Sequence, residues 1–199
     1  MFLNGAGQPL IHGKSKEYGQ HRGPLLLSSA AFNDPIFPQN WSKCVVGSKE
    51  DILRYNNFRS FTENCSFKTL LPNTPSEIKC DESVIIVTLI PAGKMENLLE
   101  SQLFYIDNGY TRYLIVDSLS SYLDFLPKAH GSFHSGIRKG IDVLYVNEEL
   151  LNETTINEDL YSLVDLIKPK FIYGLREREL PKWLLDLRRI NDIYKRLKK

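Results

Sequence analysis

An aliphatic run with one threonine, Val84 to Ile90, constrains the fold more than any other stretch of the chain. A strand that is apolar at nearly every position has to be buried on both faces, which is usual for strands of parallel sheets covered by helices. We therefore expect this run to be a central strand with a helix layer on either side. Even when it is extended to Ala92, the run is nine residues long, and a membrane-spanning helix needs about 20.

Short β-branched or aromatic runs alternate with amphipathic segments along the rest of the chain. Further strands are expected at 43–46, 113–116, 141–146 and 171–173, and helices from Ser48, over 95–104 and over 160–167. Residues 63–82, which are punctuated by prolines, are expected to be irregular. The alternation favours right-handed βαβ crossovers. We expect a three-layer α/β/α fold with a mainly parallel, Rossmann-like sheet of about four or five strands.

The first 40 residues differ in composition from the rest. They contain five of the twelve glycines and four of the ten prolines, which favours an extended arm over a regular helix. Within this arm, Leu25, Leu26 and Leu27 follow Pro24 and are expected to form a short edge strand. Phe32 and Phe37 are too apolar to remain in water, so the arm should dock on a protein surface. The predicted organisation is an arm (1–40), an α/β domain (41–180) and a terminal helix (181–199).

The terminal helix is expected to be amphipathic and basic. Pro181 suits its first turn, and Trp183 and Leu187 lie on one apolar stripe. Residues 176–199 hold nine Lys and Arg against four Asp and Glu. The helix should pack on or beside the domain. Arg188 and Arg189 then form a solvated face, or they contact an acidic protein partner or nucleic-acid phosphates.

Charge and cysteine content exclude several classes of function. The formal net charge of +1 gives no overall electrostatic reason to bind nucleic acid or a membrane. Cys44, Cys65 and Cys80 form no Cys-x-x-Cys pair and have no histidine at ligand spacing, so we expect reduced thiols, no metal and no cofactor. The first residues lack the pattern of a secretory signal, which predicts an intracellular protein of the cytoplasm or nucleus.

Candidate catalytic residues are selected by their place in the predicted fold. Ligands of open parallel sheets bind outside the carboxyl ends of the strands, where Asp117 and Asn147 are expected. Lys94 follows the central strand in a turn that lacks the full phosphate-binding loop motif. His130, His134 and Arg138 lie in a segment with three glycines, which we expect to be an exposed loop able to contact an anion.

Because no catalytic or cofactor motif is complete, the sequence favours a non-catalytic protein-interaction subunit of a larger intracellular complex, with enzymatic activity left open. Its expected partner-binding residues are Leu25, Leu26, Leu27, Phe32, Phe37, Trp183, Leu187, Arg188 and Arg189. The opposing hypothesis is an enzyme acting on a phosphate-containing substrate, as a phosphoesterase or nucleotide-binding protein. Its residues would be Lys94, Asp117, His130, His134 and Arg138. A nucleic-acid-binding subunit that uses the basic terminal helix is a third hypothesis.

Overall fold

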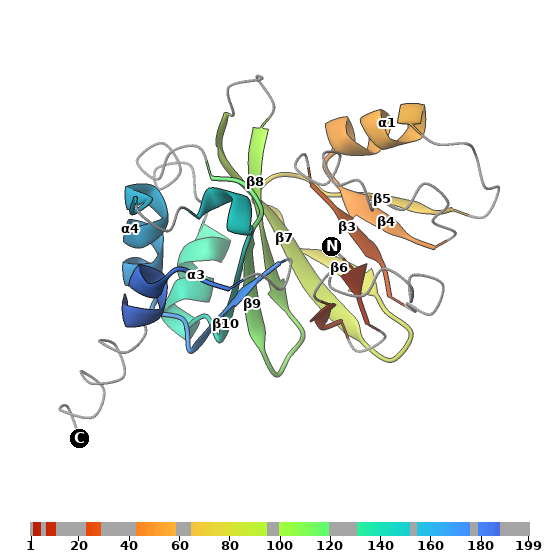
Figure 1. The fold of residues 1–199 in the computed structure, drawn as a ribbon. Coiled ribbons are helices and arrows are strands. Elements are labelled where there is room, and N and C mark those ends of the chain that lie inside the picture. The colour runs from red at the N-terminus through yellow and green to blue at the C-terminus, as the bar shows by residue number, and fades with distance from the viewer. Residues whose placement is uncertain are drawn as a thin grey trace.

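The chain folds into two sheets that face each other, each with helices on its outer side (Figure 1). The computed structural model describes residues 2–4, 7–10, 23–28, 43–58, 65–94, 100–119, 131–151, 155–175 and 179–187. Helix α1 (Lys49–Phe58) covers one sheet, while α3 (Gly131–Lys139) and α4 (Glu158–Ile167) cover the other. In these ranges no helix is both long and apolar enough to span a membrane.

The larger sheet has six strands in the order β11-β10-β9-β8-β7-β6. They are β6 (Ser76–Lys79), β7 (Val84–Lys94), β8 (Glu100–Asp107), β9 (Arg112–Val116), β10 (Val143–Val146) and β11 (Phe171–Gly174). Neighbouring strands from β6 to β9 are antiparallel, and β9, β10 and β11 are parallel to one another. The sheet is therefore mixed, with its parallel part at one side. A 3₁₀ turn, η3 (Glu148–Leu150), follows β10.

The smaller sheet is formed mainly by the N-terminal part of the chain. Its order is β2-β1-β3-β4-β5, from β1 (Phe2–Leu3), β2 (Pro9–Leu10), β3 (Leu25–Leu27), β4 (Val45–Gly47) and β5 (Phe67–Thr69). Strand β1 is antiparallel to β2 and β3, whereas β3, β4 and β5 are parallel. The expected edge strand over 25–27 is thus an interior strand, and the expected irregular region 63–82 contains β5 and β6.

The prediction of a three-layer, mainly parallel Rossmann-like sheet is wrong, because β7 and β8 form an antiparallel hairpin. The helix expected over 95–104 is replaced by β8, whose Leu103 pairs with Ile90 of β7. Alternate residues of β8 enter different cores: Leu103 lies in one and Phe104 in the other. A strand that is apolar on both faces lacks the alternation of polar and apolar residues that would identify it. In addition, Leu98, Leu99 and Leu103 match helical spacing.

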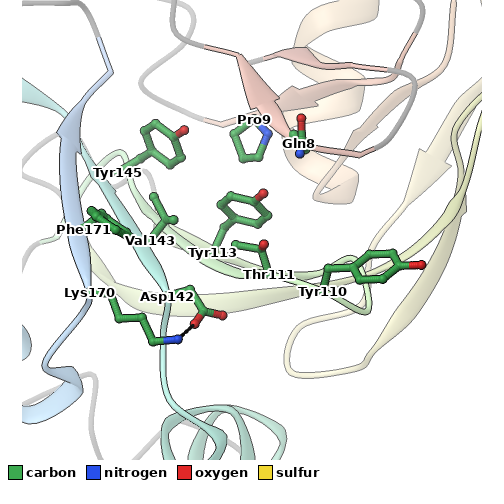
Figure 2. A pocket seen from close by; sticks show the side chains of 10 residues that line it. All are labelled: Gln8, Pro9, Tyr110, Thr111, Tyr113, Asp142, Val143, Tyr145, Lys170 and Phe171. Carbon is green, nitrogen blue, oxygen red and sulfur yellow. Dashed lines mark hydrogen bonds and ion pairs between the residues drawn. The ribbon is translucent and has the colours of Figure 1, made fainter.

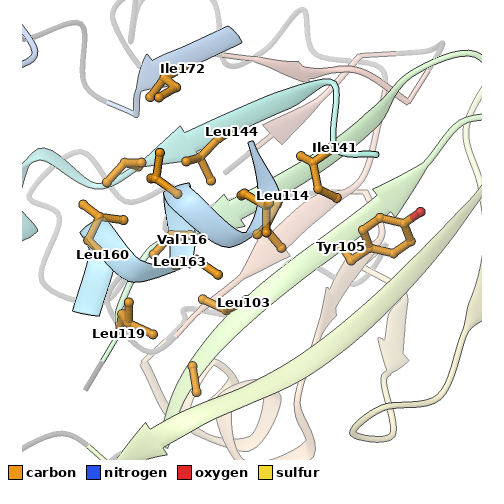
Figure 3. Close-up of a cluster of buried hydrophobic side chains, with 14 of the residues drawn as sticks. Leu103, Tyr105, Leu114, Val116, Leu119, Ile141, Leu144, Leu160, Leu163 and Ile172 are labelled. Atoms are coloured by element: carbon orange, nitrogen blue, oxygen red, sulfur yellow. The ribbon is translucent and has the colours of Figure 1, made fainter. Parts of the chain in front are cut away.

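Two hydrophobic cores hold the layers together. The first lies between the larger sheet and its helices and contains Leu114, Leu144 and Leu163 (Figure 3). The second lies between the sheets, where Leu26 and Val46 of the smaller sheet belong to the same cluster as residues of the larger one. Since Leu26 and Val46 are at most 1% exposed, each side chain contributes about 1.5–3 kcal/mol of burial free energy.

Local sequence explains the start of α1, but it gave the wrong structure for α3. Helix α1 begins after Ser48, as expected: Asp51 N–H donates to Ser48 Oγ at 3.0 Å, and Ser48 Oγ donates to Asp51 Oδ2 at 2.8 Å. The loop expected over 130–140 is instead helix α3. Its Gly136 lets the helix approach Tyr105 of β8, so this glycine serves packing rather than a turn.

Gly136→Ala is expected to lower the free energy of unfolding by about 1–3 kcal/mol, the usual cost of overpacking. A Cβ at this position would lie 2.8 Å from Cζ of the Tyr105 ring, which is buried. Gly131→Ala in the same helix is the matched control, since its Cβ would meet nothing within 4 Å and alanine favours helix by up to about 1 kcal/mol. Urea denaturation measures both variants. Equal stability would show that α3 does not press on β8.

Candidate functional site

The carboxyl ends of the parallel strands of both sheets meet at a cluster of polar side chains. Ser28 directly follows β3, Asp117 follows β9, and Asn147 follows β10. The hydroxyl of Ser28 donates a hydrogen bond to Asp117 Oδ2, although the two residues lie 89 positions apart in the chain. This hydrogen bond joins the two sheets at the edge where α/β proteins commonly bind their ligands.

Asn147 fixes the orientation of the Asp117 carboxylate. Its Nδ2 donates to Asp117 Oδ1 at 3.1 Å and to the Asp117 main-chain oxygen, also at 3.1 Å. Ser28 and Asn147 are 4% and 3% exposed, and Asp117 is partly buried. One carboxylate oxygen therefore faces the serine and the other faces the amide, and little water competes for either contact.

Two further carboxylates lie beside the ends of neighbouring strands. Glu148 is buried, and its carboxylate lies against Gly174 at the end of β11. A Cβ added to Gly174 would be 2.1 Å from Glu148 Oε1. Asp51 is occupied by the helix cap at Ser48, the residue that follows β4. Because Leu27 pairs with Gly47, Ser48 and Ser28 leave adjacent strands. Serine, asparagine and carboxylate side chains thus gather at this edge.

The residues predicted for a phosphate-processing enzyme occupy several regions. Asp117 belongs to the cluster, and Lys94 is the last residue of β7. His134 and Arg138 are exposed on α3. Arg138 is in the last turn of α3. The carbonyl of the next residue, Lys139, accepts a hydrogen bond from Arg112 at the start of β9, whereas Asp117 follows the other end of that strand. His130 lies outside the described residues.

The residues predicted for partner binding divide in a similar way. Leu25, Leu26 and Leu27 are β3 itself and are at most 1% exposed. Leu187 is buried and Trp183 partly buried in the core beneath α4, on a helix over residues 182–187. Phe32, Phe37, Arg188 and Arg189 lie outside the described residues.

Ser28 was missed by the inspection of strand ends. The signal was present, since Ser28 follows a three-leucine run as Asp117 follows Tyr113–Val116. Residues 24–27 were assigned to the docking arm. The end of this strand was therefore not among the predicted ligand-binding positions.

Comparison with known proteins finds similarity only among solved structures. No protein-family model matches the chain, and no curated protein matches it. The metallo-β-lactamase fold protein YhfI from Bacillus subtilis is 13% identical with a TM-score of 0.45, over 75% of this chain and 58% of YhfI. A Thermotoga maritima protein assigned to the Zn-dependent hydrolases of the metallo-β-lactamase superfamily is 12% identical with a TM-score of 0.40, over 85% and 76% of the two chains. CmlA, a diiron β-hydroxylase from Streptomyces venezuelae, is 9% identical with a TM-score of 0.32, over 70% and 36%.

The prediction of a non-catalytic scaffold or complex subunit is corrected, because its physical premise fails. The prediction required an apolar arm that its own domain could not bury. Leu25, Leu26 and Leu27 are instead buried within the chain's smaller sheet.

The metals named for two of these proteins do not fit the donor set described for this chain. Nowhere in the described ranges do three His, Cys, Asp or Glu side chains come together in a way that could hold a metal ion. The serine and the asparagine that contact Asp117 are not usual zinc ligands. The chemistry proposed below therefore uses only these side chains.

Proposed function

We propose that this chain is a hydrolase of small uncharged esters, with Ser28 as the nucleophile and Asp117 as its general base. The observation that carries the proposal is the hydrogen bond from Ser28 Oγ to Asp117 Oδ2. A serine hydroxyl is a weak nucleophile until a neighbouring base accepts its proton, and the base in turn has to be oriented by a third group. Asn147 supplies that orientation through Asp117 Oδ1.

The reaction would proceed in two balanced steps. Ser28 Oγ attacks the carbonyl carbon while its proton passes to Asp117, and the departing alcohol takes that proton as the ester C–O bond breaks. Water then attacks the acyl-serine, with its proton received by Asp117 and returned to Ser28 as the carboxylic acid leaves. Asp117 starts and ends as a carboxylate, so it acts as base and acid in turn.

The charge of the cluster favours an uncharged substrate. Asp117 and Glu148 are two carboxylates at the same edge of the sheets. A phosphate group would be repelled here, because like charges in a poorly solvated site interact strongly. The small exposed fraction of Ser28 further favours a short acyl group.

The proposal predicts that 4-nitrophenyl acetate acetylates Ser28. Acid quenching within the first turnover, followed by peptide mass spectrometry, should place the acetyl group on the peptide that contains Ser28, and Ser28→Ala should abolish both this adduct and turnover. Ser135→Ala is the matched control, since Ser135 is exposed on α3 and its loss should change neither. Hydrolysis by the Ser28→Ala variant at the wild-type rate would refute the proposal.

A further inference from the structure

A pocket of about 490 Å³ opens at the opposite end of the parallel strands from Ser28. Tyr113, Val143 and Phe171, which are paired near the start of β9, β10 and β11, form its floor. Pro9 of β2 and the neighbouring Gln8 lie across from them (Figure 2). The remaining lining residues are Tyr110, Thr111, Asp142, Tyr145 and Lys170. Its volume is within the range of small-molecule sites, about 300–1,000 Å³.

A row of aromatic rings gives this pocket flat, apolar surfaces. The ring centroids of Tyr113 and Tyr145 are 6.4 Å apart, and those of Tyr145 and Tyr173 are 5.7 Å apart. Phe171 continues the row at 6.4 Å from Tyr173, and both of these edge-strand rings are more than two-fifths exposed. Rings spaced in this way offer stacking or edge contacts to another planar ring, worth about 0.5–1.5 kcal/mol for each pair beyond area burial.

Two phenol hydroxyls point into the pocket, toward Pro9 and Gln8 (Figure 2). Tyr113 and Tyr145 are only 6% and 8% exposed, and neither hydroxyl has a hydrogen-bond partner among the described residues. The rings are buried, but solvent in the pocket reaches the two hydroxyls, so a bound ligand can take its place. Burial, reinforced by Tyr113 and Tyr173, raises the pKa of Tyr145 to about 12, so at neutral pH its hydroxyl is a donor. The pocket therefore presents two donors that lack an acceptor.

An ion pair lies in the wall of the pocket. Asp142 Oδ1 accepts from Lys170 Nζ at 2.5 Å, and both residues line the pocket. Asp142 Oδ2 also lies 3.5 Å from Arg112 Nε, behind the lining residues. Burial alone would raise the pKa of Asp142, but the hydrogen bond from Lys170, the Arg112 N–H and the two cations outweigh it and lower the pKa. The Lys170 side chain is 61% exposed, so it is the cation of the wall that an anion can approach.

We propose that this pocket binds a small planar aromatic monocarboxylate. The carboxylate accepts hydrogen bonds from the hydroxyls of Tyr113 and Tyr145, while the ring lies against Pro9, Val143 and Phe171. One carboxylate satisfies both donors and lies within the field of Lys170, and the rigid ring matches the aromatic walls. The proposal is independent of ester hydrolysis, because the pocket and Ser28 lie at opposite ends of the sheet.

The probe for this site is 2-naphthoate, titrated calorimetrically into the full chain, with 2-naphthylmethylammonium as the analogue of opposite charge. We expect 2-naphthoate to bind and the ammonium compound to bind at least tenfold more weakly. Tyr145→Phe and Tyr113→Phe each remove only a hydroxyl, and each should weaken 2-naphthoate by roughly tenfold, since a hydrogen bond to a charged group contributes about 1.5–3 kcal/mol. Tyr161→Phe, on the exposed side of α4, should leave the affinity unchanged.

Three outcomes would overturn the proposal: no heat of binding for 2-naphthoate at millimolar concentration, equal or tighter binding of the ammonium compound, or wild-type affinity in the Tyr113→Phe/Tyr145→Phe double variant. Thermal unfolding of each variant shows whether it is folded. Ser28→Ala should bind 2-naphthoate as the wild type does, so loss of ester hydrolysis and loss of this site are measured separately.

Discussion

Asp117→Asn is expected to slow the hydrolysis of 4-nitrophenyl acetate by about 10²- to 10⁴-fold, the usual contribution of a general base. An asparagine side chain has nearly the same shape as aspartate, so it can keep a contact with Ser28, but its amide cannot take the hydroxyl proton. The release of 4-nitrophenolate in the steady state measures the effect. Because both steps of the proposed reaction pass a proton through Asp117, acylation and deacylation should slow together.

Asp165→Asn is the control for this substitution. Asp165 is exposed on α4, away from the carboxyl ends of the strands, and removing its charge should leave the rate unchanged. If Asp117→Asn retained the full rate, Asp117 would not be the base, even if Ser28 still formed the acetyl adduct.

Leu144→Ala is expected to lower the free energy of unfolding by about 2–5 kcal/mol, the usual cost of truncating a buried leucine. Leu144 is fully buried at the centre of β10, and in register it lies between Leu114 of β9 and Ile172 of β11. All three belong to the core beneath α4 (Figure 3). Because Leu144 has a paired strand on each side, the surrounding side chains cannot move far into the space left by its truncation. We therefore expect a cavity to remain.

Urea denaturation of Leu144→Ala and Leu71→Ala tests this expectation. Leu71 is 65% exposed, and its truncation should change stability by no more than about 0.5 kcal/mol. Since small domains are stable by only about 5–15 kcal/mol, the core variant should lose a large part of its margin. If Leu144→Ala lost no more stability than Leu71→Ala, the packing of Leu144 in this core would not contribute to the free energy of unfolding.

Local patterns predicted the elements whose two faces differ in polarity or whose ends carry clear signals. The strands expected at 113–116 and 171–173 are β9 and β11, and the helix expected over 160–167 is α4. In α4 the buried residues Leu160, Leu163, Val164 and Ile167 lie on one stripe, so helical periodicity was visible. The apolar run Val84–Ile90 lies in β7, as expected, but Val84 is exposed and the neighbours β6 and β8 are antiparallel to it.

The errors arose where tertiary contacts decide the structure. Nothing near Gly136 in the sequence shows that Tyr105 will lie against it, so three glycines predicted a loop where a helix forms. Ser28 gains its role only because two sheets bring it to Asp117. Asp117 itself could be selected from sequence, since a polar residue after a buried strand is sufficient to mark it.

In the proposed reaction, the hydrogen bond between Ser28 and Asp117 would also make activity depend on the association of the two sheets. Neither sheet alone contains both partners, and contacts between distant parts of a chain form slowly because a long loop has to close first. A species with complete strands and helices but separated layers would have no reactive serine. The proposed activity would thus report on the joining of the two layers, which secondary structure alone does not.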